Sequence, residues 1–321
     1  KILGLLTRKL NNMLSRVAET LYWMSRYVER TENVARLINV NNLLIMDLPK
    51  GVSSGWAPLI DIIGVREEYQ KNHKDFSEQS ALRFLLTGEN NHSSILNSIS
   101  NARENARTIR DVLPKCIWEG INSLYHYVKD NKNEGLTKRG RFAYLKHIID
   151  STQMIFGALD GTINHNDGYV FICFGSIIER ADMTSRILDV RSATLITDEE
   201  TKPYDNIQWM SLLRSLSAYQ MYRQEMGVRV QRKEIIEFVM LSEVFPRSIL
   251  FCLYKLKQLI GPLDNSSQVI ELIDDASSNL KDSDVRALKN GDLHEYIDQL
   301  QIKLAGIHNA LVESYFLKSV Q

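Results

Sequence analysis

The chain has 321 residues, of which 44% are hydrophobic and 24% charged, a composition typical of globular proteins. Acidic and basic residues balance at 39 each, so no overall positive field draws the chain to nucleic acid or to an anionic membrane. No apolar run approaches the ~18 residues that a bilayer-spanning helix needs. Three isolated cysteines without a paired spacing favour a reducing compartment, and we predict a cytoplasmic protein.

Glycine and proline are scarce, which favours long helices, and no window shows the sustained alternation of a β-strand. We predict an all-α bundle of about ten to twelve helices. Loops are expected at Lys50–Ala57 and Thr197–Asn206. In chain order, the expected helices are 14–47, 58–70, 82–87, 91–113, 117–130, 142–159, 169–196, 209–222, 230–241, 245–260, 266–280 and 284–317.

Met13 resembles a natural start, so residues 1–12 are predicted to be an upstream extension or a cloning remnant. Residues 13–321 are expected to form one all-helical domain. Two related motifs 150 residues apart are too widely spaced for a solenoid repeat. They suggest two halves, 13–150 and 151–321, packed as one body.

The first helix separates its side chains into faces at 3.6 residues per turn. An apolar stripe runs through Val17, Leu21, Met24 and Val28 and must be buried. A polar row, roughly opposite, carries Arg26, Glu29 and Arg36. Arg30 lies between them on a flank shared with the aromatic residues Trp23 and Tyr27, and we expect that flank to pack as well.

The dipeptide Glu29-Arg30 recurs as Glu179-Arg180, and each copy is followed by an acid and then by an arginine, Arg36 or Arg186. A single Glu-Arg pair on a helix is normally solvated. Recurrence, together with the aromatic flank, favours partial burial, and a buried charge needs a partner. Two interpretations follow: a buried structural network, or a site that binds or transforms a charged ligand.

Arg103, Arg107 and Arg110 lie on one face of the helix expected at 91–113. Such a row is usually solvated or paired with acids of a neighbouring helix. It is also suited to holding a carboxylate or phosphate, so Arg103 and Arg107 are secondary binding candidates.

Common catalytic signatures are absent from the sequence. No phosphate-binding glycine loop is present, the seven histidines show no metal-ligand spacing, and a dimetal bundle would need two Glu-x-x-His motifs. Gly51-Val-Ser-Ser-Gly55 matches a nucleophile elbow in letters, but it lacks the preceding strand and is predicted to be a plain loop. We therefore predict neither a cofactor nor a metal.

The motifs resemble those of the bacterial Alpha-E family, named for an all-helical fold with a Glu-Arg motif. The resemblance covers Met13 to nearly the end of the chain. One departure is Ser176, where the family pattern would place an arginine three residues before the second Glu-Arg. The segments that carry the resemblance are Leu14–Arg36, Arg103–Arg110, Glu179–Asp189, Trp209–Ser215 and Phe245–Ser248.

The resemblance implies a genetic neighbourhood that includes a circularly permuted ATP-grasp ligase and a transglutaminase-like protease. Our first hypothesis is a helical accessory or scaffold protein that works with these partners on a peptide-like product. The alternative is an enzyme in which Glu29 or Glu179 acts as acid or base. Arg30 or Arg180 would then bind a substrate carboxylate. Nucleic-acid and membrane partners are not expected, and the sequence does not indicate an oligomeric state.

Overall fold

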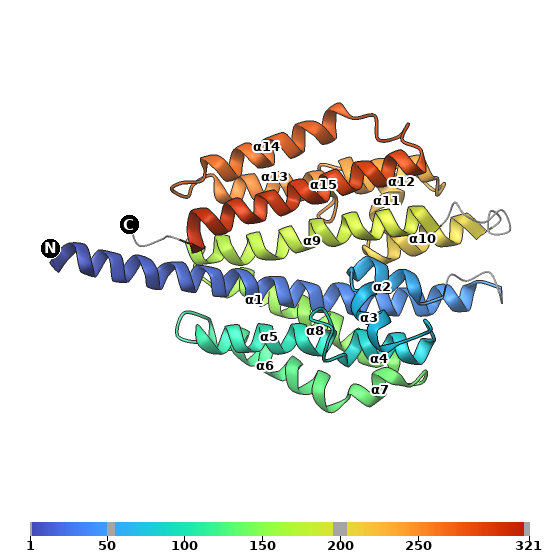
Figure 1. Ribbon diagram of the computed structural model, residues 1–321, viewed down its shortest axis with the longest axis horizontal. Helices are drawn as coiled ribbons and strands as arrows, with labels where there is room; N and C mark the ends of the chain where they lie inside the picture. The colour runs from blue at the N-terminus through green and yellow to red at the C-terminus, as the bar shows by residue number, and fades with distance from the viewer. Residues whose placement is uncertain (1, 50–54, 195–203, 318–321) are drawn as a thin grey trace.

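The computed structural model describes residues 2–49, 55–194 and 204–317, and every regular element in these ranges is a helix (Figure 1). The all-α prediction is therefore confirmed. The predicted number of helices is too low, because the described ranges contain fifteen α-helices and one short π-helix. The loops expected at Lys50–Ala57 and Thr197–Asn206 fall largely outside the described residues. None of the described helices combines the length and the apolar composition that crossing a bilayer requires.

The helices form two consecutive sets, each beginning with a long helix. The first set is α1 (Ile2–Asp47), α2 (Ala57–Ile63), α3 (Arg66–Asn72), α4 (Glu78–Thr87), α5 (Ile95–Thr108), α6 (Lys115–Asp130), α7 (Lys132–Leu136) and α8 (Arg141–Thr162). The second set is α9 (Asp167–Thr194), α10 (Asp205–Ser215), α11 (Tyr219–Glu225), α12 (Arg232–Leu241), α13 (Ile249–Ile260), α14 (Ser267–Asp282), α15 (Asn290–Leu311) and the π-helix η2 (Val312–Phe316). The expected division at residue 150 falls inside α8, so the sets meet between α8 and α9.

Two predicted helices are each broken into a pair of shorter ones. The helix expected at 58–70 becomes α2 and α3, because Gly64 ends α2 in the left-handed conformation with φ of 74°. The helix expected at 209–222 becomes α10 and α11, separated by Ser217 at φ of 54°. Both breaks follow a long central helix, so the two sets share the same order of long and short elements.

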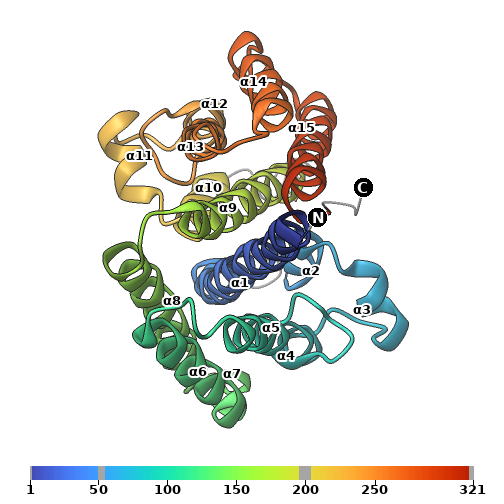
Figure 2. The same ribbon diagram turned by 90° about the vertical axis from the view of Figure 1, so that its left-hand side faces the viewer.

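Helices α1 and α9 lie side by side at the centre, and the other helices of each set surround them (Figure 2). The short helices α2 and α10, which follow them in the chain, lie at the same end of the molecule (Figure 1). The central helices therefore run in the same direction. Helix α2 packs mainly on α9, whereas α10 packs mainly on α1, so each set covers the central helix of the other.

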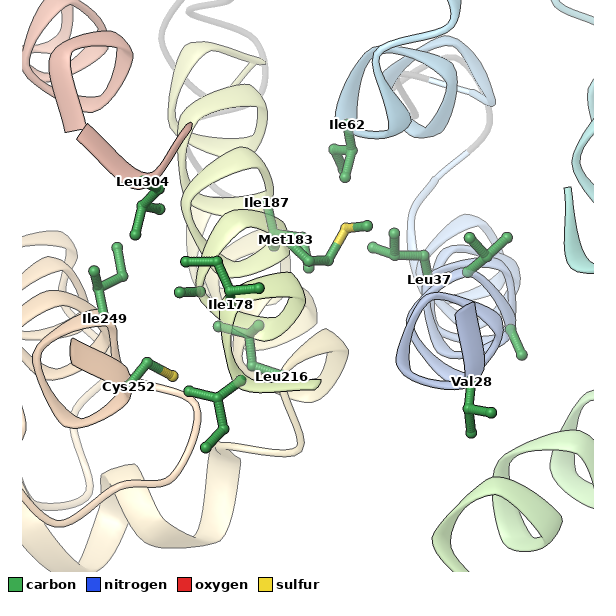
Figure 3. Close-up of a cluster of buried hydrophobic side chains, with 14 of the residues drawn as sticks. Val28, Leu37, Ile62, Ile178, Met183, Ile187, Leu216, Ile249, Cys252 and Leu304 are labelled. Carbon is green, nitrogen blue, oxygen red and sulfur yellow. The ribbon is translucent and has the colours of Figure 1, made fainter. Parts of the chain in front are cut away.

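This enclosure buries apolar side chains on several faces of both central helices. Figure 3 shows Ile62 of α2, Met183 of α9 and Leu37 of α1 facing one another in the core. Fully burying one such side chain contributes about 1.5–3 kcal/mol. The row predicted to be polar and opposite the core is also inside, because Glu29 on α1 is fully buried against α9. Residues on that row therefore need partners within the protein.

The central helices approach most closely at Gly175 of α9. A Cβ atom at this position would lie 2.4 Å from both the carbonyl oxygen of Tyr22 and Oγ of Ser25. Such distances are far shorter than a van der Waals contact, and one of the two atoms belongs to the backbone of α1. Glycine at position 175 is thus required for the spacing of α1 and α9.

Replacing Gly175 with alanine is expected to destabilise the protein by about 1–3 kcal/mol, because α1 must move away from α9. The free energy of unfolding from urea titration measures the change. The matched control is Gly157→Ala on an exposed part of α8, where a new Cβ atom meets nothing within 4 Å. That substitution should stabilise the protein by up to ~1 kcal/mol through helix propensity. Equal effects at the two positions would contradict the close approach.

Candidate functional site

The two Glu-Arg dipeptides face each other across the interface of α1 and α9, and their pairing is crossed. The glutamate of each dipeptide binds the arginine of the other, so Glu29 pairs with Arg180 and Glu179 pairs with Arg30. This geometry follows from two parallel helices with equivalent residues at the same level. The prediction that distant helices bring the two dipeptides together agrees with this arrangement.

The Glu29 site comprises Glu29, Arg180 and Arg247. Arg180 donates from Nε to Oε1 of Glu29 at 3.1 Å and from Nη2 to Oε2 at 2.8 Å, a bidentate contact. Arg247, which precedes α13, donates from Nη1 to Oε1 at 3.0 Å. The carboxylate thus accepts three hydrogen bonds while its side chain is 0% exposed.

The Glu179 site comprises Glu179, Arg26 and Arg30. Arg30 binds Glu179 in the same bidentate manner, with Nε to Oε1 at 2.6 Å and Nη2 to Oε2 at 2.9 Å. Arg26 donates from Nε to Oε2 at 2.8 Å. Its guanidinium carbon lies 5.0 Å from the ring centre of Trp23, and that of Arg30 lies 5.7 Å from the ring of Tyr27. The aromatic flank of α1 therefore supports both arginines.

Both carboxylates are held in the charged form. Burial alone would raise the pKa of Glu179, but Arg30 and Arg26 outweigh it and lower that pKa from 4.5 to about 2. Burial likewise opposes ionisation of Glu29, yet Arg180 and Arg247 lower its pKa below the ordinary value. At neutral pH neither group binds a proton readily, and both act as fixed negative charges.

A second pair of contacts repeats one turn further along each helix. Arg36 hydrogen-bonds Glu32 on α1, and Arg186 donates from Nε to Oδ2 of Asp182 on α9 at 2.9 Å. Arg247 links the two layers, because its Nη2 donates to Oε1 of Glu32 at 3.0 Å. Arg36 and Arg186, both predicted binding residues, thus lie beside the crossed pairs and are bound to acids of their own helices.

Arg103 and Arg107 are not part of this network. Both lie on α5 and pair with Glu104 of the same helix, at 2.9 and 2.8 Å. Arg103 also donates to Oδ1 of Asn122 on α6 at 2.8 Å and packs over the ring of Tyr125. The acid that pairs with the row is thus on the same helix and not on a neighbouring one as expected, and the structure does not bring Arg103 and Arg107 to the Glu-Arg dipeptides.

A cavity of about 180 Å³ adjoins the Glu179 site. We name it the Ser93 cavity after the residue that lines it just before α5. Its charged lining consists of Arg26, Arg30, Glu179, Asp182 and Arg186. A larger cavity of about 300 Å³, beside Asp167 and Asp264, touches neither dipeptide.

Comparison with known proteins identifies the family of the chain. Residues 13–316 match the sequence profile of Alpha-E, described as a predicted alpha-helical domain with a conserved ER motif. The chain belongs to the Alpha-E family. Both Glu-Arg dipeptides of this Alpha-E domain lie in the crossed pairs, which join the two central helices through buried charges.

Curated relatives of this Alpha-E domain include uncharacterised proteins of Mycobacterium bovis and Mycobacterium tuberculosis. Each is 22% identical over 320 aligned positions, which cover 92% of this chain and 35% of the relative. The chain therefore spans about a third of the length of these relatives. No solved structure matches it significantly.

Arg247 is the residue of the Alpha-E site that the sequence reasoning missed. It lies in Phe245-Pro-Arg-Ser248, a segment that carries the family resemblance, but nothing in its spacing connects it with position 29. Ser248 caps the N-terminus of α13 by accepting from the amide of Phe251, and this cap fixes the chain beside Glu29. Arg247 also supplies the second arginine that Ser176 cannot provide.

Glu29→Ala is expected to destabilise the Alpha-E domain by about 3–5 kcal/mol, because it leaves the largely buried Arg180 without its carboxylate and removes one of the two acids that bind Arg247. Urea unfolding measures the loss. Glu119→Ala is the control, since Glu119 forms an exposed pair with Lys115 and should change stability by at most ~1 kcal/mol. A small effect at Glu29, equal to that at Glu119, would contradict the structural role of the pair.

The low pKa of Glu179 predicts acid sensitivity. The folded pKa lies below the unfolded one, so the unfolded chain binds more protons and stability falls as pH drops from about 4.5 towards 2. The loss from this group between pH 5 and pH 3 should be about 2 kcal/mol. Urea unfolding at the two pH values measures it, and Glu179→Gln should reduce the pH dependence by the same amount. An unchanged dependence in the variant would show that Glu179 is not the group responsible.

Proposed function

We propose that this chain is a cytoplasmic, non-catalytic helical accessory protein in the synthesis or processing of a peptide-like product. Its proposed partners are the ATP-grasp ligase and the transglutaminase-like protease that the family resemblance implies. The ligase would supply the nucleotide chemistry, for which this sequence carries no phosphate loop. The chain would contribute a rigid helical surface that positions the product or the ligase.

One observation carries the non-catalytic part of the proposal. Each buried glutamate has its oxygens occupied by two arginines, with three hydrogen bonds to each carboxylate. A general base needs a pKa near the working pH and a free lone pair directed at the substrate. Glu179 does not fit this role, because its pKa is about 2 and both of its oxygens already accept hydrogen bonds from arginines.

The Ser93 cavity favours the enzyme alternative in one respect, because Glu179 and Arg30 both line it. A ligand there would be within reach of a dipeptide, as the alternative requires. However, Arg30 already uses Nε and Nη2 to hold Glu179, so that carboxylate would have to lose a charged partner before taking a proton. Because losing this ion pair costs free energy, catalysis by Glu179 is a weaker candidate than the accessory role.

The experiment that tests the proposal is co-expression with the neighbouring ligase, followed by co-purification and mass spectrometry of its products with and without this chain. We expect a complex, and a product whose yield depends on the chain. Glu29→Gln and Glu179→Gln should retain that yield within a few-fold wherever circular dichroism shows an intact fold. General acid-base catalysis by either residue would instead cost roughly 10²–10⁴-fold. Absence of both a complex and a product change would overturn the accessory role.

A further inference from the structure

The two helix sets place equivalent residues in equivalent positions, and this includes the connections before α5 and α13. Gly88 ends α4 and Ser242 ends α12, and each donates its amide to a phenylalanine carbonyl four residues earlier. Six residues later, Ser94 and Ser248 are the N-caps of α5 and α13. The side chain of each serine accepts a hydrogen bond from the backbone amide three residues further along. Position 93 in the first set therefore corresponds to position 247 in the second.

The residues at these two positions differ greatly in size. Arg247 extends over Glu29 and Glu32 and fills the space beside them, with its side chain 13% exposed. Ser93 has a short side chain, and the corresponding space beside Glu179 and Asp182 is the Ser93 cavity. The cavity is thus the volume that an arginine occupies in the other half of the molecule.

Glu179 does not need a further cation in that space, because arginines from α1 already pair with it. Arg26 on α1 gives Glu179 the second arginine that Arg247 gives Glu29. At the position on α9 equivalent to Arg26 stands Ser176, so each site has two arginines on its glutamate but from different elements. The difference leaves one site filled and the other open.

The open site carries positive charge. Three guanidinium groups, those of Arg26, Arg30 and Arg186, line it together with the carboxylates of Glu179 and Asp182, which gives a net charge of +1. Among the described residues, no hydrogen-bond partner is found for Nη1 of Arg30 or for the two Nη atoms of Arg186. Ser93, which also lines the cavity, lies just before Ser94, the N-cap of α5.

From this we propose that the Ser93 cavity binds the carboxylate of a small ligand, such as the C-terminal end of a short peptide, between Arg30 and Arg186. A single carboxylate neutralises the net charge of +1, whereas a phosphate dianion would exceed it. The volume of about 180 Å³ is below the ~300–1,000 Å³ typical of pockets for drug-sized molecules, which suits one end of a chain. The inference rests on the proposed function in one respect, that the site binds a peptide-like product without transforming it.

The test is titration of the isolated chain with N-acetylglycine, with N-acetylglycinamide as the neutral analogue and with inorganic phosphate, followed by calorimetry. N-acetylglycine should bind, and the neutral analogue should bind at least about tenfold more weakly, because it lacks the charge that the arginines recognise. Comparable binding of the two glycine derivatives, tighter binding of phosphate, or no binding of N-acetylglycine at millimolar concentrations would overturn the proposal.

Two variants localise the binding. Ser93→Arg restores the side chain of the other half and should fill the cavity, while Arg186→Gln removes a guanidinium from its wall. Each should weaken N-acetylglycine binding about tenfold or more. Arg286→Gln is the matched control, since Arg286 is also a partly exposed arginine paired with an acid, Glu237, and it should leave binding unchanged. An equal loss in the control, or full binding in both cavity variants with intact folds, would contradict the assignment. The titration contains no ligase, so its outcome does not depend on whether this chain acts as an accessory protein of the ligase.

Discussion

The structure depends on the crossed pairing of two buried glutamates with arginines of the opposite central helix. A buried ion pair adds little stability over a well-packed apolar pair, but a buried charge without its partner is costly. The pairing therefore acts mainly by making other relative positions of α1 and α9 unfavourable. Sliding α1 along α9 by one turn would separate Glu29 from Arg180 and Glu179 from Arg30 at once. Together with the close contact at Gly175, these pairs define one position for the two helices around which the rest is packed.

That constraint explains why the central helices look unlike ordinary surface helices. Each is covered by its own set and by a short helix of the other, α10 on α1 and α2 on α9. No side chain of α1 from Leu21 to Asn42 is exposed, and the acids of this stretch, Glu29 and Glu32, are paired inside the protein. In the Glu29 site Glu29 is fully buried, Arg180 is 21% exposed and Arg247 is 13% exposed, whereas the Glu179 site borders the Ser93 cavity. The two sites thus share a chemical plan and differ in whether protein fills the space beside the acid.

The sequence alone was sufficient for the fold class, for most long helices and for the two dipeptides as the focus of the molecule. It was insufficient for the breaks at Gly64 and Ser217, because a left-handed residue between two apolar turns leaves the helical periodicity unchanged. It also placed Glu29 on a polar row away from the core, since periodicity shows which residues share a face but not what covers that face. Arg247 was missed for a related reason. Its contact with Glu29 spans 218 positions and exists only once α13 is docked on α9.

The asymmetry between the two sites bears directly on how such a fold acquires a binding function. If an arginine filled the space beside Glu179 as Arg247 fills the space beside Glu29, the network would have no cavity for a ligand. Position 93 carries a serine where the other half of the molecule carries an arginine. Arg26 binds Glu179, so the cavity does not leave this buried carboxylate without a partner. In the charged lining that remains, Arg26, Arg30 and Glu179 are held by the contacts that fix α1 on α9, and Arg186 is held by Asp182 of its own helix. A ligand carboxylate would meet guanidinium groups already oriented by their acids, which reduces the entropy lost on binding. The arginines that keep Glu179 charged are therefore also the ones that, in the proposed site, would orient positive charge towards a bound anion.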